Sequence, residues 1–137
     1  MPRYLLIVDY RPGVDDTPMD RWQPGEITAH MNYYDALNAA LRESGELVGG
    51  EALTMPATAK EVTSDGRTAP VVTDGPFAEA KEMLAGFQIV EVESEARAVE
   101  IAALVSAVPG PGGVPLRQPV IVRRVMDDSD FHEMTGL

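Results

Sequence analysis

The feature that most restricts the fold of this chain is an alternation of strand and helix patterns. Residues 24–43 carry apolar side chains at helical spacing, namely Ile27, Met31, Tyr34, Leu37 and Leu41. A second helix is predicted after Ser94, which can cap its first turn, and its buried stripe is Ala98, Ile101, Ala102, Val105 and Val108. Four runs are typical of strands: 3–10, 47–53, 87–93 and 117–125. The pattern therefore predicts an α+β fold.

A hairpin is predicted between the second and third of these strands. Residues 58–63 and 68–72 flank Ser64-Asp65-Gly66-Arg67, a sequence typical of a tight turn. With a helix returning between strands on one face of the sheet, the arrangement is the split βαβ of ferredoxin-like folds. Both faces of the first strand are apolar, so something else must cover the second face. We expect a second copy of the same sheet, which gives a two-fold homodimer.

Size and composition restrict the class of protein. The chain has 137 residues, enough for one domain, and no cysteine, which excludes disulfides, cysteine-ligated metals and cysteine nucleophiles. Its formal charge of -11 argues against nucleic acid as a partner. We expect a domain over 1–126 and an acidic tail over 127–137. The composition of the tail is typical of a surface segment, either ordered or disordered. No signal peptide or membrane-spanning run is evident, so a cytoplasmic protein without membrane contact is expected.

The segment 71–84, VVTDGPFAEAKEML, is the most informative short stretch. A β-branched run stops at Asp74-Gly75-Pro76, and a short helix is predicted over 76–84 with Gly86 just past its end. Because Pro76 has no backbone N–H, Asp74 can cap that of residue 77. Alternatively, it can point into a cleft with Phe77 as a wall. Lys81 can orient an anion, or pair with a neighbouring glutamate on a solvated face, and the second role is favoured.

Two further residues are candidates for acid–base chemistry. His30 lies beside the apolar stripe of the first helix, where a neutral imidazole can act as a base near neutral pH. The alternative, favoured by the sequence, is a border histidine that packs against Tyr34 and the solvent. Asp9 ends the first strand on an otherwise apolar face, where a carboxylate must be paired or lie at the rim. Asp9 and His30 would form an acid–base dyad if they meet. No ligand spacing indicates a metal site, and no cofactor is expected.

Several motifs, in order, resemble a known family. Asp74-Gly75-Pro76-Phe77, followed by Lys81-Glu82, is similar to the signature of the DGPF proteins, a branch of the YCII-related superfamily. The segments GELVGGEAL (45–53) and PATA (56–59), and Gly86-Phe87, also resemble the family, so that the resemblance covers about residues 3–125. The chain departs from the family pattern at Ala80, at 60–63 and at 121–124, where only Arg123 of the last motif is kept.

The resemblance implies a ferredoxin-like protomer that forms a dimeric α/β barrel. Distant enzyme members of the superfamily use a His/Asp pair in a cleft, whereas DGPF proteins have no agreed reaction. We therefore expect a small organic molecule to be bound, and an enzyme version would use His30, Asp74 and Asp9. The residues predicted to line the cleft are Phe77, Tyr34, Glu51, Lys81 and Arg123. The alternative is a protein–protein regulator, because DGPF proteins are often encoded beside extracytoplasmic-function sigma factors and the acidic tail could engage a basic partner.

Overall fold

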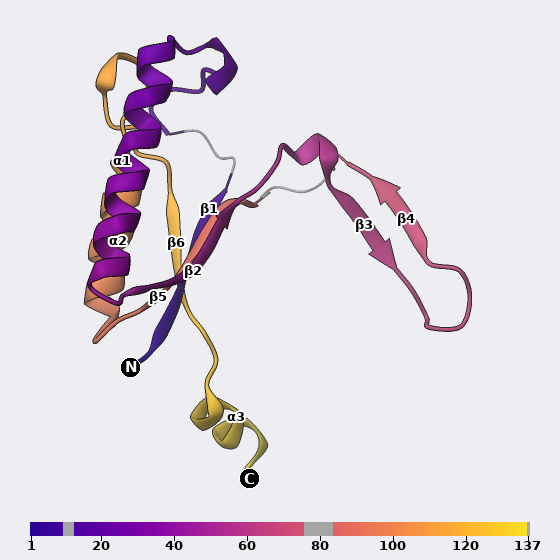
Figure 1. Cartoon of the computed structure of the whole chain (residues 1–137). Helices are drawn as coiled ribbons and strands as arrows, with labels where there is room; N and C mark the ends of the chain where they lie inside the picture. The colour runs from indigo at the N-terminus through magenta and orange to yellow at the C-terminus, as the bar shows by residue number, and fades with distance from the viewer. Residues whose placement is uncertain (10–12, 76–83, 137) are drawn as a thin grey trace.

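Figure 1 shows a computed structural model of the chain, which describes residues 1–9, 13–75 and 84–136. The core is a four-stranded antiparallel sheet in the order β2-β5-β1-β6. Its strands are β1 (Arg3–Asp9), β2 (Leu47–Ala52), β5 (Leu84–Glu91) and β6 (Val120–Arg124). The two long helices, α1 (Pro24–Glu43) and α2 (Glu95–Ser106), both lie on one side of this sheet. The predicted α+β class is confirmed, and the strand order is consistent with a ferredoxin-like protomer.

Both long helices begin at caps that the sequence encodes locally. Pro24 is the first residue of α1, and Gln23 and Glu26 form a reciprocal capping box with each other's backbone N–H groups. In α2 the Ser94 side chain accepts from the N–H of Arg97 at 3.2 Å, as predicted. Ser44 ends α1, and Gly45 follows with a φ of 80°. The predicted bounds of the first helix are therefore confirmed.

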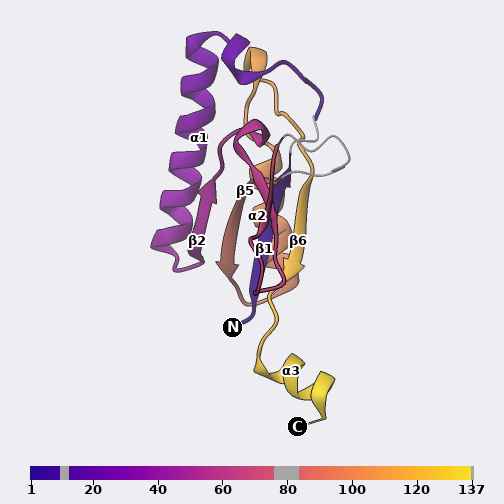
Figure 2. The same ribbon diagram turned by 90° about the vertical axis from the view of Figure 1, so that its right-hand side faces the viewer.

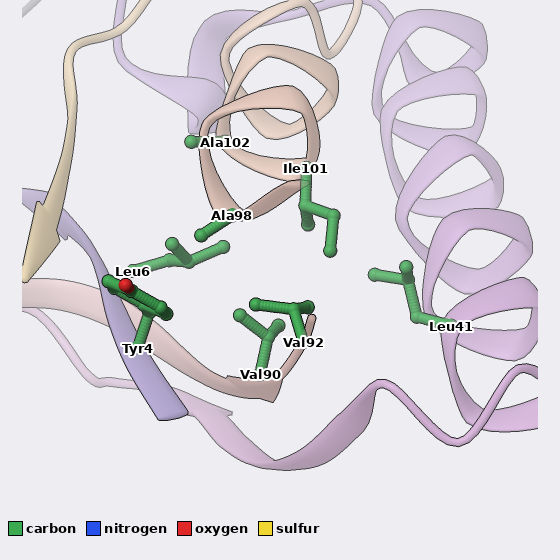
Figure 3. Close-up of a cluster of buried hydrophobic side chains, with 8 residues drawn as sticks. All are labelled: Tyr4, Leu6, Leu41, Val90, Val92, Ala98, Ile101 and Ala102. Carbon is green, nitrogen blue, oxygen red and sulfur yellow. The ribbon is translucent and has the colours of Figure 1, made fainter. Parts of the chain in front are cut away.

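The main core lies between the sheet and the helices. Figure 3 shows its buried side chains, which are Tyr4, Leu6, Leu41, Val90, Val92, Ala98, Ile101 and Ala102. The predicted stripe of α2 is confirmed at Ala98, Ile101, Ala102 and Val105, whereas Val108 is buried but lies beyond the helix, which ends at Ser106. The predicted stripe of α1 is wrong at Met31, whose side chain is 49% exposed, while His30 is buried in its place. A second cluster joins Trp22, Val108 and Leu116 near the N-terminal end of α1.

Strands β3 (Lys60–Thr63) and β4 (Val71–Asp74) form a separate two-stranded sheet. We call residues 60–74 the arm, because it projects from the four-stranded sheet on the side opposite the long helices (Figure 1). A short 3-10 helix, η2 (Pro56–Thr58), precedes it, so the predicted strand start at residue 58 is wrong. The connection is longer than the predicted turn and spans 64–70.

Other predicted boundaries also need correction. Strand β5 starts at Leu84, so that residue belongs to a strand rather than to the predicted helix over 76–84, the rest of which lies outside the described residues. The last strand starts only at Val120, because Arg117 has a φ of 56° that is incompatible with a strand. The acidic tail is helical: α3 (Asp128–Thr135) is capped by Asp127 and ends at Gly136 in a left-handed conformation.

Candidate functional site

The face of the sheet opposite the long helices is apolar. The strand register places Ile7 beside both Phe87 and Ile121, and Leu5 beside Ile89. Since directly paired residues share a face, these five side chains form one surface across β1, β5 and β6. All five are half-buried, and α1 and α2 pack on the opposite face, where Tyr4, Leu6 and Val90 lie. We call Leu5, Ile7, Phe87, Ile89 and Ile121 the open face.

Charged residues border the open face, and two of them, Arg3 and Glu91, pair with each other at one end of it at 3.6 Å. Glu51 on edge strand β2 pairs with Phe87, and Arg123 on edge strand β6 pairs with Leu5. Both side chains are exposed, and they lie at opposite edges of the sheet. A carboxylate and a guanidinium flanking an apolar surface can orient a polar molecule, or pair with opposite charges on a partner. The structure therefore places two of the predicted ligand-binding residues on one surface.

Asp9 lies at the end of β1, beside a β-bulge. The register shifts between Val8 and Asp9, so that Asp9 pairs with Leu84. Asp9 is only 2% exposed, and its backbone oxygen accepts from Nε2 of Gln118 at 2.6 Å. Removing a carboxylate from water is costly unless other groups compensate, and such residues often mark functional sites. Asp9 is thus a buried acidic residue at the end of β1, two positions after the open-face residue Ile7.

His30 occupies the helical layer. Its ring meets the rings of Trp22 and Tyr34 edge to face, with centroid distances of 5.3 and 5.1 Å. Nδ1 lies 2.9 Å from the backbone oxygen of Pro109. Because a carbonyl can only accept, Nδ1 carries the proton. Burial lowers the pKa of the imidazole, which keeps the ring neutral. These contacts favour the packing role over the catalytic one.

Tyr34 belongs to the same aromatic cluster as His30. Burial, with a smaller contribution from Tyr33, raises the pKa of its phenol to about 12. The neighbouring Tyr33 donates from its hydroxyl to the backbone oxygen of Leu104 at 2.6 Å and so ties α1 to α2. Tyr34 and His30 therefore lie on the helix side of the sheet, whereas Glu51 and Arg123 border the opposite face. The structure divides the predicted cleft residues between the two sides.

Asp74 lies on the arm. It is the last residue of β4, its side chain is exposed, and it pairs with the Nζ of Lys60 across the hairpin at 2.5 Å. Figure 1 shows β4 and α1 on opposite sides of the four-stranded sheet, so Asp74 and His30 are in different parts of the molecule. Phe77 and Lys81 fall outside the described residues. Within 1–9, 13–75 and 84–136, no group of three His, Asp or Glu side chains is placed to hold a metal ion.

Two structural residues were missed by the sequence reasoning. Trp22 forms one wall of the His30 cluster, and its indole N–H donates to the Thr17 oxygen at 2.9 Å. A lone tryptophan in a loop rich in Pro, Gly and Asp was a usable signal, since so large a ring is normally packed. Gln118, which bonds the backbone of Asp9, had no signal because that contact joins residues 109 positions apart.

The fold is α+β and consistent with a ferredoxin-like protomer, and comparison with known proteins then gives its family. The chain belongs to the YCII-related family, whose domain model matches residues 3–114. It is also similar to an uncharacterized protein of Rhizobium meliloti (strain 1021), with 32% identity over 104 residues that cover 75% of this chain and 83% of that one. The predicted relationship to the YCII-related superfamily is confirmed. No helix among the described residues is long and apolar enough to cross a membrane.

Proposed function

We propose that this protein is a homodimer in which two open faces pack together as an α/β barrel and enclose a site for a small organic molecule. The observation that carries the proposal is the apolar character of Leu5, Ile7, Phe87, Ile89 and Ile121 on a face that α1 and α2 leave uncovered. Sheets that are apolar on both faces are normally covered on both. In a chain of this size a second copy supplies that cover with two-fold symmetry.

The polar groups around the open face indicate where a ligand would bind. Asp9 and Glu51 lie near one end of that face, and Arg123 lies on the opposite edge strand. An apolar surface with a few charged groups at its border is the usual composition of a small-molecule site. We expect Phe77 to complete its wall, as the sequence predicts. Glu51 and Arg123, whose side chains are exposed, are the groups that would orient a polar atom of the ligand.

The proposed interface is tested by introducing a glutamate at one of two positions, the first on the open face and the second as a control. Ile7→Glu places a carboxylate at the centre of the open face, and Val99→Glu places one at an exposed position of α2, on the other side of the sheet. We expect the parent chain and the Val99 variant to sediment as dimers and the Ile7 variant to sediment as a monomer. A parent chain that is monomeric at tens of micromolar, or an Ile7 variant that stays dimeric, would refute the proposed interface. Native mass spectrometry of the parent then shows whether a small molecule accompanies the dimer.

The enzyme version of the proposal uses His30 as acid or base, with Asp74 or Asp9 orienting it. It requires a rearrangement that brings His30 out of its contacts with Trp22 and Pro109. The test is turnover of the molecule found by native mass spectrometry, with His30→Ala and Asp74→Asn measured separately. Unchanged turnover in both variants excludes His30 and Asp74 from the chemistry. If the parent binds the molecule without any turnover, the enzyme version is refuted and the binding function stands.

A second function is favoured by helix α3. This short helix exposes Phe131 (54%) and Met134 (65%) beside the carboxylates of Asp128 and Glu133. An acidic helix with exposed apolar side chains suits a basic protein partner, and an extracytoplasmic-function sigma factor is the candidate that the family resemblance implies. Co-purification from cells with and without residues 127–137 tests this function. Loss of a partner on truncation supports it, and identical co-purifying proteins contradict it.

A further inference from the structure

The arm is ordered by local contacts, yet it packs against no other described element. Every residue of β3 and β4 is exposed, and the strands pair only with each other. An isolated two-stranded hairpin is marginally stable in water, because it buries too little surface to offset its loss of entropy. The hairpin therefore needs a packing partner that this single chain does not supply among its described residues.

Local hydrogen bonds nevertheless define both ends of the arm. At its base, the Gly75 N–H donates to the Ala59 oxygen at 2.7 Å. At its tip, one oxygen of Asp65 accepts from the backbone N–H groups of Arg67 and Thr68, both at 2.9 Å. These bonds lower the pKa of the Asp65 carboxyl. These bonds define the local shape of the arm at its base and at its tip.

The two faces of the arm differ in polarity. Val62 pairs directly with Val72 on one face, and the ion pair of Lys60 with Asp74 lies at the end of the same face. Val62 and Val72 are 58% and 53% exposed, which is unfavourable for adjacent β-branched side chains in water. The opposite face carries Glu61, Thr63, Val71 and Thr73. The Val62–Val72 pair thus marks the face that would be buried against a partner.

The position of the arm identifies that partner. Figure 1 shows the arm standing away from the sheet on the side opposite α1 and α2, which is the side of the open face. Seen from that side in Figure 2, the arm lies in front of the sheet. A second copy seated on the open face would therefore also meet the arm, so the two surfaces are continuous.

We propose that the arm of each protomer packs, through Val62 and Val72, against the second copy of the chain. This inference rests on the proposed homodimer and adds a second contact to it. Two arms exchanged across the two-fold axis would bury four valine side chains, because each copy provides both members of the pair. The arm is then a clasp that strengthens the dimer beyond what the open faces contribute.

The test compares two double variants on the same hairpin. Val62→Lys with Val72→Lys puts two charges on the face of the Val62–Val72 pair, and Thr63→Lys with Thr73→Lys puts the same charges on the opposite face. We expect the first to raise the dimer dissociation constant roughly 10- to 100-fold and the second to change it less than about threefold. The dissociation constant is measured by sedimentation velocity over a dilution series.

The outcomes separate this inference from the dimer itself. If Ile7→Glu gives a monomer but the valine variant dimerises like the parent, the dimer stands and the clasp is refuted. Equal weakening by both double variants refutes the choice of face, and a monomeric parent refutes the dimer and the clasp together. Amide exchange of the parent gives an independent readout: residues 60–63 and 71–74 should exchange at least about tenfold more slowly above the dissociation constant than below it. Equal rates overturn the clasp.

Discussion

The Nδ1–H of His30 donates to the backbone oxygen of Pro109 at 2.9 Å, joining helix α1 to a loop 79 positions later in the chain. The bond closes the aromatic cluster formed with Trp22 and Tyr34. It also explains why a histidine rather than the neighbouring Met31 faces inward at this turn of α1. The imidazole offers both a ring for edge-to-face packing and a donor for a buried carbonyl.

We predict that His30→Ala lowers the free energy of unfolding by about 2–4 kcal/mol, since it removes a buried hydrogen bond and leaves a cavity among aromatic rings. Urea denaturation followed by tryptophan fluorescence measures the loss, because Trp22 is the single tryptophan and contacts this ring. The matched control is His132→Ala on the exposed side of α3, which should change stability by less than about 0.5 kcal/mol. Similar losses in the two variants would contradict the packing role of His30.

The pH dependence of stability should follow the same residue. Burial lowers the pKa of His30 in the folded state, so the unfolded chain takes up this proton first as the pH falls. The contribution of neutral His30 is complete above the unfolded pKa of about 6.5 and is lost as the pH falls from there through the lower folded pKa. We expect His30→Gln to flatten the stability profile between pH 7.5 and 5.5. A His30→Gln variant that keeps the slope of the parent contradicts the assignment.

Gly50 should be intolerant of any side chain. It has a φ of 150°, and an added Cβ would lie 2.6 Å from the backbone oxygen of Phe87 and 2.9 Å from Cα of Gln88. Because both obstacles belong to the sheet backbone, we expect Gly50→Ala to destabilise by more than about 2 kcal/mol. Gly25→Ala, at a helical position with open space around it, should be neutral or stabilise by up to about 1 kcal/mol. Thermal melts of the two variants check the contrast.

Arg97 holds the start of α2 against the turn before β2. Its guanidinium binds both carboxylate oxygens of Glu46, with Nε and one terminal nitrogen at 2.8 and 2.9 Å. We expect Arg97→Lys to cost about 1 kcal/mol, because lysine keeps the charge but loses the two-pronged geometry. Arg3→Lys, at a single and more exposed contact with Glu91, should cost little. Equal effects on the urea midpoint would show that geometry at Arg97 is unimportant.

Acid should weaken the same ion pair. The bonds from Arg97 hold the pKa of the Glu46 carboxyl below its usual value. The stabilisation is present above the unfolded pKa and is lost as the pH falls through the lower folded pKa. Parent and Arg97→Lys stabilities should therefore converge in strong acid. A gap that persists below pH 2 in urea denaturation would indicate that packing, not the ion pair, causes the difference.

The cap of α3 is a further point of weakness. The Asp127 side chain accepts a hydrogen bond from the backbone N–H of Asp130 at 3.1 Å. The Asp130 side chain in turn accepts one from the backbone N–H of Asp127 at 2.9 Å. We predict that Asp127→Ala removes about 1 kcal/mol of helix stability and speeds amide exchange across α3. Asp128→Ala, which changes only a charge in the first turn, should have an effect of a few tenths of a kcal/mol. If the backbone amides of α3 exchange at the same rate in the Asp127 and Asp128 variants, the capping role of Asp127 is contradicted.

Local signals predicted the regular part of the fold well. The bounds of α1, the Ser94 cap and the buried stripe of α2 all depend on neighbours within four residues along the chain, which a sequence pattern records. The strand runs and their order were enough to indicate the ferredoxin-like arrangement. The helical tail was mistaken for possible disorder, because its acidic composition outweighed a capping box that was visible in Asp127 and Asp130.

The candidate site was harder to predict, because it depends on which sides of the sheet its residues occupy. Residue type marked His30, Asp9 and Asp74 as ionisable groups of interest, but it could not place one in an aromatic cluster, one at a strand end and one on the arm. The sequence alone determined the two long helices, the approximate positions of the strands and the family, since these follow from periodic and ordered motifs. Only the tertiary structure decided that His30 is bonded to Pro109, that the open face lacks cover from α1 and α2, and that the arm projects beyond it. Those relationships join residues distant in the chain, and the packing of whole elements, rather than any local preference, sets them.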